Sequence, residues 1–255
     1  MKRFGLIGRR LGHSFSQEYF MRKFAELGLK DYCYELFELL SVEGLKEWAL
    51  REGLSGFNVT VPYKIDIIQE LDALDEVATA VGAVNCVAVE DGRLVGHNTD
   101  APAFRDTLMT SLNTKNLTLN TAFILGTGGA ARAVAYALGQ LGIDYTFVSR
   151  HPEQHDNAIS YDYFCAGKMP AVQGRGVLIV NATPVGMYPD VDAMPLPDNF
   201  QFSIFNFQFV YDLIYNPSPT RLLREASVLG LGVKDGLEML HLQADLSWKI
   251  WGIKK

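Results

Sequence analysis

A glycine-rich loop lies at the midpoint of this 255-residue chain, between a short apolar run and a segment of helical composition. Residues 122–125 predict a buried strand, and residues 130–141, which are rich in alanine and leucine, predict a helix. Between them, Gly126 permits a tight turn, Gly128 lets the backbone approach a pyrophosphate, and Ala131 lets the helix pack closely on the strand. Free N–H groups at the start of such a helix bind anions, so this order predicts a nucleotide site.

The residues after the second predicted strand, at 144–148, indicate which nucleotide binds. An acidic side chain about 20 residues past the first glycine is typical of sites for a free ribose 2′-hydroxyl. The chain has Ser149, Arg150 and His151 there and no acid. Because a guanidinium pairs well with a 2′-phosphate, Arg150 favours NADP. The alternative is a solvated arginine at a strand end.

Composition excludes several classes of protein. The chain is 48% hydrophobic and 20% charged, as soluble globular proteins are, and its net charge of −6 argues against nucleic acid and anionic membranes as partners. No apolar run approaches the roughly 20 residues of a membrane span. The apolar run at the start of the chain is too short for a signal peptide. Cys33, Cys86 and Cys165 are scattered, which predicts a cytoplasmic protein with neither a disulfide framework nor a metal site.

Predicted strands and helices alternate along the chain, which favours an α/β architecture. A first unit ends near Asp100. Its strands are expected at 4–7, 32–37, 55–61 and 83–89, with a hairpin turn at 90–93, and its helices at 16–27, 42–51 and 65–74.

The second unit follows a connecting helix at 101–113. Its strands are expected at 122–125, 144–148, 177–181 and 209–214. Residues 151–175 are expected to be irregular, with the sheet trimmed there, and residues 237–251 to form a long final helix. Five phenylalanines within residues 200–209 predict a core strand or buried loop rather than an aromatic binding site.

Two serines follow the first predicted strand. On an extended segment, Ser14 and Ser16 would point the same way and would donate to a carboxylate. Alternatively, Ser16 caps the following helix, a role for which Ser14 is not needed.

A lysine and an aspartate lie where the first unit is expected to form a cleft. Asn58 and Thr60 share one face of a strand that Pro62 ends, and Lys64 follows. Asp100 lies where the first unit meets the second. A lysine at a strand end is usually solvated, but a Lys–Asp pair in a cleft can exchange a proton with a substrate.

Along its whole length the chain resembles the shikimate dehydrogenase family. Eight elements occur in that family's order: Ser14 with Ser16, residues 58–64 (NVTVPYK), 82–85 (GAVN), 98–100 (NTD), 126–130 (GTGGA), 181–187 (NATPVGM), 212–217 (DLIYNP) with Thr220, and Gln243.

The resemblance implies a two-domain α/β fold. An N-terminal substrate domain, residues 1–100, would be completed by residues 237–255, and residues 101–236 would form a Rossmann-type NADP-binding domain. It implies a monomer or homodimer that reduces 3-dehydroshikimate to shikimate reversibly with NADPH, in a cleft that closes on binding.

The resemblance also implies the role of each site residue. Lys64 and Asp100 would be the catalytic pair. Substrate would be bound by Ser14, Ser16 and Tyr215 at its carboxylate and by Thr60, Asn85, Asp100 and Gln243 at its ring hydroxyls. The cofactor would be bound by Gly126, Thr127, Gly128, Gly129 and Ala130 at the pyrophosphate, Ser149 and Arg150 at the adenosine phosphate, and Leu213 and Gly236 at the nicotinamide.

The chain departs from the family pattern in a few places. Gln17, Tyr19 and Phe20 replace the family's proline and His-Asn after the serines, and His151 replaces a threonine that would donate to the phosphate. The family's regular helix after Arg150 is not evident, and the last helix carries variants at Glu238 and His241.

Two other functions remain open from the sequence. A quinate or quinate/shikimate dehydrogenase would differ near the carboxylate-binding residues, where two serines and a tyrosine favour shikimate. A catalytically silent NADP-binding regulator would have no evident need for both Lys64 and Asp100.

Overall fold

The computed structural model describes residues 1–12, 14–167, 176–202 and 207–254. The chain divides into two compact units, Met1–Asp100 with Gln243–Lys255, and Ala101–Leu242. The sequence-based boundary at residue 237 differs from this one because a single helix, α8 (Leu237–Ile250), contains both positions.

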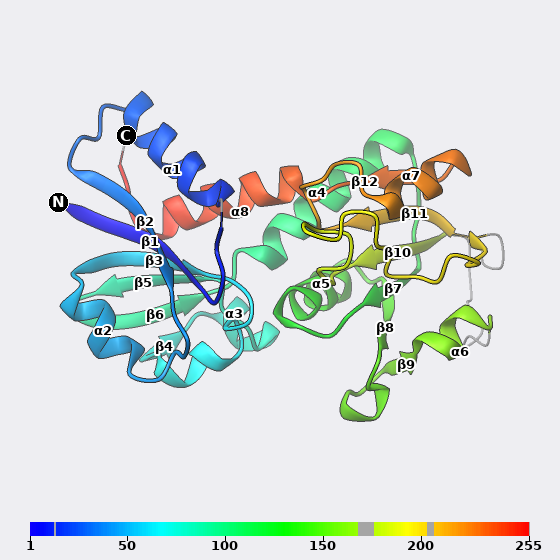
Figure 1. The fold of residues 1–255 in the computed structure, drawn as a ribbon, viewed down its shortest axis with the longest axis horizontal. Helices are drawn as coiled ribbons and strands as arrows, with labels where there is room; N and C mark the ends of the chain where they lie inside the picture. Colours follow the sequence, from blue (N-terminus) through cyan, green and yellow to red (C-terminus); the bar gives the residue numbers. More distant parts are fainter. Residues whose placement is uncertain (13, 168–175, 203–206, 255) are drawn as a thin grey trace. The chain divides into compact units, whose positions relative to one another are not determined.

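The first unit is built on a mixed six-stranded sheet (Figure 1). Its strands are, in spatial order, β2 (Tyr32–Glu38), β1 (Lys2–Gly8), β3 (Leu54–Val59), β5 (Cys86–Glu90), β6 (Arg93–His97) and β4 (Ala73–Leu74). The strand β1 pairs in parallel with both neighbours, and β5 runs antiparallel to β3 and β6. The predicted hairpin between residues 83–89 and 94–96 is therefore confirmed.

Alternation along the strands gives this sheet two apolar faces. Phe4 and Leu6 point to the face covered by α1 (Phe15–Glu26) and by Trp248 of α8. Ile7 points to the opposite face. That face is covered by α2 (Leu45–Arg51), the 3₁₀ helix η1 (Asp66–Glu70) and α3 (Glu76–Val81).

The helix predicted over residues 65–74 is wrong. Only the 3₁₀ turn η1 forms, and Ala73–Leu74 become the edge strand β4, parallel to β6. The cause is a pairing distant in sequence: Asp72 exchanges hydrogen bonds with the backbone of Leu94, 2.9 Å through its own N–H and 2.8 Å through its carboxylate. Apolar spacing typical of a helix does not reveal such a pairing.

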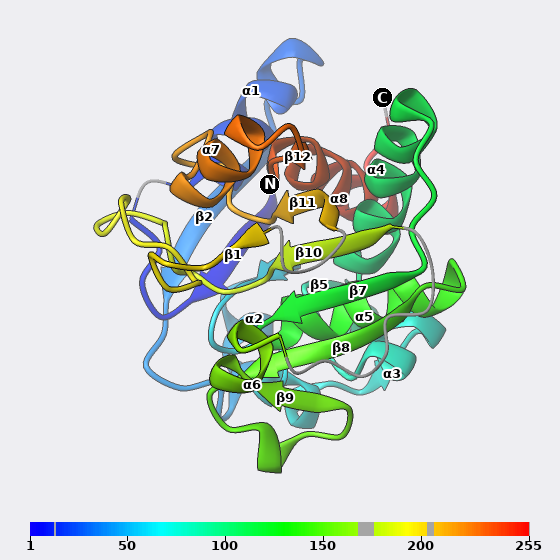
Figure 2. The ribbon, with the colours of Figure 1, turned by 90° about the vertical axis from the view of Figure 1, so that its right-hand side faces the viewer.

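The second unit contains a six-stranded sheet in which every pair is parallel, and Figure 2 shows its strands lying side by side. Its spatial order is β12 (Gly232–Lys234), β11 (Phe207–Asp212), β10 (Val177–Asn181), β7 (Thr121–Leu125), β8 (Asp144–Ser149) and β9 (Ala158–Ser160). Numbered from β7, this is the order 3-2-1-4-5-6 of a Rossmann fold, the class of domain predicted here. Ligands of such sheets bind at the carboxyl ends of the strands where the order reverses, here between β7 and β10.

The helices that pack against this sheet include α4 (Asp100–Lys115), α5 (Gly129–Gln140) and α7 (Arg221–Val228). On α4, Phe104 packs against Tyr211 with ring centroids 5.0 Å apart, and Thr107 shares a 2.7 Å hydrogen bond with the Tyr211 hydroxyl.

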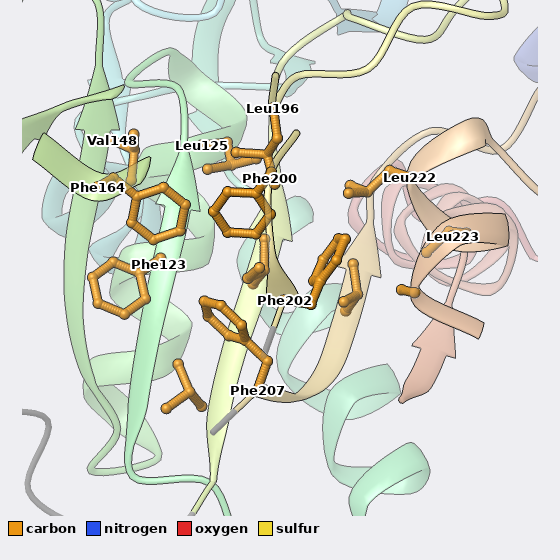
Figure 3. Close-up of a cluster of buried hydrophobic side chains, with 14 residues drawn as sticks. Phe123, Leu125, Val148, Phe164, Leu196, Phe200, Phe202, Phe207, Leu222 and Leu223 are labelled. Carbon is orange, nitrogen blue, oxygen red and sulfur yellow. The ribbon is translucent and has the colours of Figure 1, made fainter. Parts of the chain in front are cut away.

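The phenylalanine-rich segment contributes to the core of the second unit, as predicted. Phe200, Phe202 and Phe207 pack with Phe123 and Phe164 in one buried cluster (Figure 3). Phe205 lies outside the described residues.

The segment after β8 is more regular than predicted. It contains a 3₁₀ turn η2 (Pro152–Gln154), the edge strand β9 and the short helix α6 (Tyr161–Cys165), so the sheet gains a strand instead of ending at β8. Phe164 of α6 is buried in the core cluster, which explains why so short a helix packs there. Residues 168–175 of the predicted irregular region lie outside the described residues.

Candidate active site

Lys64 and Asp100 form an ion pair in the first unit. The Lys64 ammonium lies 2.7 Å from Oδ2 of Asp100, and the two side chains are only 16% and 8% exposed. Lys64 follows β3, and its carbonyl accepts the Val84 N–H at 2.7 Å, which fixes the lysine beside the segment that carries Asn85. The predicted pair therefore meets.

Asn85 connects this ion pair to further polar groups. Its Nδ2 donates to Oδ1 of Asp100 at 2.8 Å and to Oγ1 of Thr99 at 2.9 Å, while its Oδ1 accepts the Thr99 N–H at 2.7 Å. Thr99 in turn donates to Oε1 of Gln243 at 3.4 Å. Five side chains from four segments of the first unit thus form one connected network.

The network leaves donors available around a single acid–base pair. An ammonium has three N–H donors, and Asp100 accepts one of those on Lys64. Because Asp100 is itself held by Asn85, it orients the amine in a fixed direction. A lysine so placed can hold or deliver a proton at a substrate oxygen.

Asn58 and Thr60 have different environments although they share a motif. Asn58 is buried and fully engaged: it donates to the Asn85 carbonyl at 3.1 Å and to Ser247 at 2.9 Å, and accepts from the Tyr34 hydroxyl at 2.9 Å. Thr60 is half-buried where β3 ends, and a Cβ at Gly8 would lie 2.7 Å from its methyl group. Asn58 therefore has a structural role, and Thr60 stays a candidate ligand.

The two serines lie at the start of α1, where Ser14 has an extended backbone but Ser16 is already helical, so they do not share one extended segment. Ser14 is the N-cap residue, and no side-chain cap hydrogen bond from it appears among the described residues. Ser16 lies within the first turn and hydrogen-bonds with Tyr34. The alternative in which Ser16 caps the helix is therefore wrong, because the helix begins two residues earlier than that role requires.

The glycine-rich loop of the second unit has the geometry that a pyrophosphate needs. Gly126 adopts a φ of +97°, and a Cβ there would lie 3.0 Å from the methyl group of Thr183, which follows β10. Gly128 is the N-cap of α5, and a Cβ there would meet no described atom within 4 Å. Together with Thr127, Gly129 and Ala130, these glycines lie at the reversal point of the strand order, at the start of a 12-residue helix.

The predicted adenosine-phosphate residues follow β8. Ser149 is buried and accepts the backbone N–H of His151 at 3.1 Å. Arg150 is exposed, and its charge acts on the half-buried phenol of Tyr161, partly offsetting the burial that raises the pKa of Tyr161 to about 12. His151 is exposed and lies 3.6 Å from the Glu153 carboxylate. Both Arg150 and His151 are thus accessible to solvent at this strand end.

Leu213, Tyr215 and Gly236 lie in the second unit, near the end of β11. A Cβ at Gly236 would lie 2.0 Å from the Leu213 carbonyl oxygen, so only glycine fits against Leu213. The Gly236 N–H donates to the carbonyl of Ile214 at 3.1 Å. Burial raises the pKa of Tyr215, which keeps its phenol protonated as a donor.

The side-chain chemistry fits a dinucleotide. The positive-φ turn at Gly126 and the open start of α5 suit a pyrophosphate, and the exposed arginine after β8 suits a 2′-phosphate. Among the described residues no group of three histidine, cysteine or acidic side chains is placed to hold a metal ion. Within the same part of the chain, no helix has the length and apolar character needed to cross a membrane.

Sequence reasoning missed the roles of Thr99, which bridges Asn85 to Gln243, and of Asp212, which ends β11. Both occur in motifs that the sequence shows. A signal for Asp212 is an acidic residue at the end of an otherwise apolar strand.

Comparison with known proteins agrees with this geometry. A family model described as "Shikimate dehydrogenase substrate binding domain" matches residues 6–87. A shikimate dehydrogenase (NADP(+)) from Shouchella clausii is 36% identical over 262 residues, which cover 100% of this chain and 94% of the relative.

Solved structures extend the comparison to the whole fold. Shikimate dehydrogenase 1 from Peptoclostridium difficile superposes with a TM-score of 0.84 at 35% identity, covering 100% of this chain and 93% of that one. Shikimate 5-dehydrogenase from Thermus thermophilus, solved in complex with NADP(H) and shikimate, gives a TM-score of 0.80 at 34% identity, covering 99% and 94%. This chain belongs to the shikimate dehydrogenase family.

Proposed function

We propose that this protein catalyses the reversible reduction of 3-dehydroshikimate to shikimate with NADPH. The observation that carries the proposal is the Lys64–Asp100 pair, held by Asn85 and Thr99 in one network with Gln243. The NADP(H)- and shikimate-bound relative and the curated relatives named for this activity support it.

The first unit supplies the acid–base chemistry. Lys64 delivers a proton to the carbonyl oxygen of the substrate as that oxygen becomes a hydroxyl, and takes it back in the reverse direction. Asp100 orients the ammonium through the 2.7 Å contact. Thr60, Asn85, Asp100 and Gln243 bind the ring hydroxyls, and Ser14, Ser16 and Tyr215 donate to the carboxylate.

The second unit holds the cofactor, which supplies the hydride when bound. Residues 126–130 bind the pyrophosphate at the start of α5. Ser149 and Arg150 bind the adenosine phosphate, and Leu213 and Gly236 line the nicotinamide position. We propose a compartment with the reduced thiols of the cytoplasm, a monomer or homodimer, and no nucleic-acid or membrane partner.

One assay tests the activity and its alternatives. The absorbance of reduced nicotinamide is followed with purified protein, shikimate or quinate, and NADP or NAD in all four combinations. The proposal expects the fastest turnover with shikimate and NADP. Faster turnover with quinate would assign the protein as a quinate dehydrogenase, and NADP binding without turnover of either substrate would assign a regulator.

A further inference from the structure

Asp212 is a fully buried carboxylate at the end of β11, in the second unit. Its Oδ1 accepts from Nδ2 of Asn181 at 3.0 Å and from the backbone N–H of Ile214 at 3.1 Å. Its Oδ2 accepts from the Thr220 hydroxyl at 2.7 Å. One side chain therefore binds three donors, one at the end of β10 and two in the segment that follows Asp212 itself.

The Asn181 contact leads to the glycine-rich loop. Asn181 ends β10, and its Oδ1 accepts both the backbone N–H of Thr183 at 3.1 Å and its hydroxyl at 2.7 Å. The methyl group of Thr183 lies against Gly126. Asp212 thus holds, through Asn181, the segment after β10 that contains Thr183.

The other two contacts lead to the nicotinamide side. Ile214 lies between Leu213 and Tyr215, and its carbonyl accepts the Gly236 N–H. Thr220 is the N-cap of α7, whose side chain accepts from Leu223. The short segment from Asp212 to Thr220, which carries Leu213 and Tyr215, is therefore fixed at both ends by the same carboxylate.

Among the described residues, the bonds to Asp212 come from an amide, a backbone N–H and a hydroxyl, and none comes from a cation. Burial raises its pKa to about 6, opposed by the bonds from Thr220, Ile214 and Asn181. A buried charge without a counter-ion is costly unless donors surround it. Its two oxygens bind three donors at once, whereas an alanine or leucine at this position offers no acceptor.

We propose that Asp212 is a positioning residue for the nicotinamide end of the cofactor site, because its carboxylate sets the segment after β10 and the segment Leu213–Tyr215 relative to each other. This inference rests on the proposed function, since that function assigns the nicotinamide to Leu213 and Gly236. Asp212 acts through these segments and not on the reacting atoms.

The test separates the two ends of the cofactor. Dissociation constants are measured for NADPH and for 2′,5′-ADP, a probe that carries only the adenosine end, in the wild type and in Asp212→Ala. Turnover of shikimate is measured in parallel. We expect Asp212→Ala to weaken NADPH about tenfold, to change 2′,5′-ADP less than about twofold, and to lower kcat by about 10²-fold through misplacement of the nicotinamide.

Two further variants control for a general loss of stability. Thr107→Val removes a buried hydrogen bond to Tyr211, the residue before Asp212, whose side chain points to the opposite face of β11. It should leave both dissociation constants and kcat within about twofold. Asp212→Asn keeps the shape and one acceptor oxygen, and should retain kcat within about threefold.

The outcomes decide the proposal in every case. Equal weakening of NADPH and 2′,5′-ADP in Asp212→Ala, an unchanged kcat, or an Asp212→Asn variant as impaired as Asp212→Ala would overturn it. If Asp212→Ala does not fold, Thr220→Val with Thr220→Ser as its control repeats the comparison. If the wild type turns over no shikimate, the proposed function fails, and the ratio of NADPH to 2′,5′-ADP affinity still decides the role of Asp212.

Discussion

Asp100 in the first unit and Asp212 in the second are both buried carboxylates, with 6% and 0% of their surfaces exposed. Asp100 lies against the Lys64 ammonium, whereas the described partners of Asp212 are an amide, a hydroxyl and a backbone N–H. Burial of a charge therefore does not by itself mark a catalytic group. The partners distinguish the two carboxylates: Asp100 is paired with an ammonium, which has protons to transfer, whereas Asp212 is held by neutral donors.

The second unit has its candidate ligand-binding cation at the surface instead. Arg150 is exposed at the end of β8, while Lys64 is only 16% exposed. An exposed guanidinium suits a phosphate that arrives from solvent, and a shielded ammonium suits proton transfer.

Removal of the paired cation should have the largest effect. Lys64→Ala is expected to lower kcat about 10²–10⁴-fold, the usual contribution of a positioned acid–base group. The dissociation constant for NADPH should stay the same, because Lys64 belongs to the other unit. Steady-state kinetics with shikimate and NADP measure the first quantity, and fluorescence titration measures the second.

The first unit offers a matched control in Lys46, which pairs with Asp72 at 2.5 Å. Lys46→Ala removes an equivalent Lys–Asp pair and should leave kcat within about twofold. Similar turnover in Lys64→Ala and Lys46→Ala would remove Lys64 from the mechanism.

Neutralising Asp100 and Asp212 in turn tests directly whether the two buried carboxylates differ in function. Asp100→Asn leaves Lys64 without its counter-charge and is expected to lower kcat/KM about 10²-fold. Asp212→Asn keeps an acceptor for its neutral donors and should lower kcat/KM less than about threefold. Losses of equal size would mean that both carboxylates serve the same purpose, and the distinction between paired and neutral partners would fail.

The pH dependence of stability gives a further contrast. Burial raises the pKa of Asp212 from 3.8 to about 6, so the folded protein binds more protons than the unfolded chain between those values. The stabilisation is fully present below pH 4 and is lost as pH rises through 6. With about 1.4 kcal/mol per pKa unit, the free energy of unfolding falls by up to about 3 kcal/mol from this group.

Urea denaturation at several pH values between 3.5 and 7 measures this effect, with Asp212→Asn as the control. The stability of the wild type relative to that variant should decline as pH rises. Parallel stability curves for the two proteins would show that Asp212 does not titrate in this window.

Much of the fold was predictable because its signals are local. The strand, glycine loop and helix from β7 to α5, and the hairpin between β5 and β6, follow from neighbouring residues. The error at residues 65–74 arose because Asp72 pairs with Leu94, a contact distant in sequence that outweighs apolar spacing. The strand β9 was missed for a similar reason, since its three residues are defined by pairing with β8.

The site was predictable as a set of residue types but not as a network. Lys64 and Asp100 each belong to a recognisable motif, but their separation of 36 positions in the sequence gives no indication of the 2.7 Å contact. Asn58 matched the family motif as well as Thr60 did, and only the structure shows its bonding capacity consumed by Tyr34, Ser247 and the Asn85 backbone. A sequence motif indicates which chemical groups are present. The contacts in the structure then show which residues of the motif still have hydrogen-bonding groups available for a ligand.

The smallest expected effect concerns the exposed cation of the second unit. Arg150→Ala should weaken NADP about tenfold and change NAD less than about twofold, because a charged hydrogen bond to the 2′-phosphate contributes about 1.5 kcal/mol and NAD lacks that group. Arg224→Ala, which removes another exposed arginine of the same unit, serves as the control and should alter neither affinity. Dissociation constants for both cofactors at low and high salt provide the measurement. The loss of NADP affinity should be smaller at high salt because the pair of guanidinium and phosphate is open to solvent.

If the ratio of NADP to NAD affinity in Arg150→Ala equals that of the wild type, the arginine is merely solvated. The preference for NADP would then have to come from neutral donors such as the hydroxyl of Ser149. The second unit would in that case bind the 2′-phosphate with neutral hydrogen-bond donors, as it binds the carboxylate of Asp212.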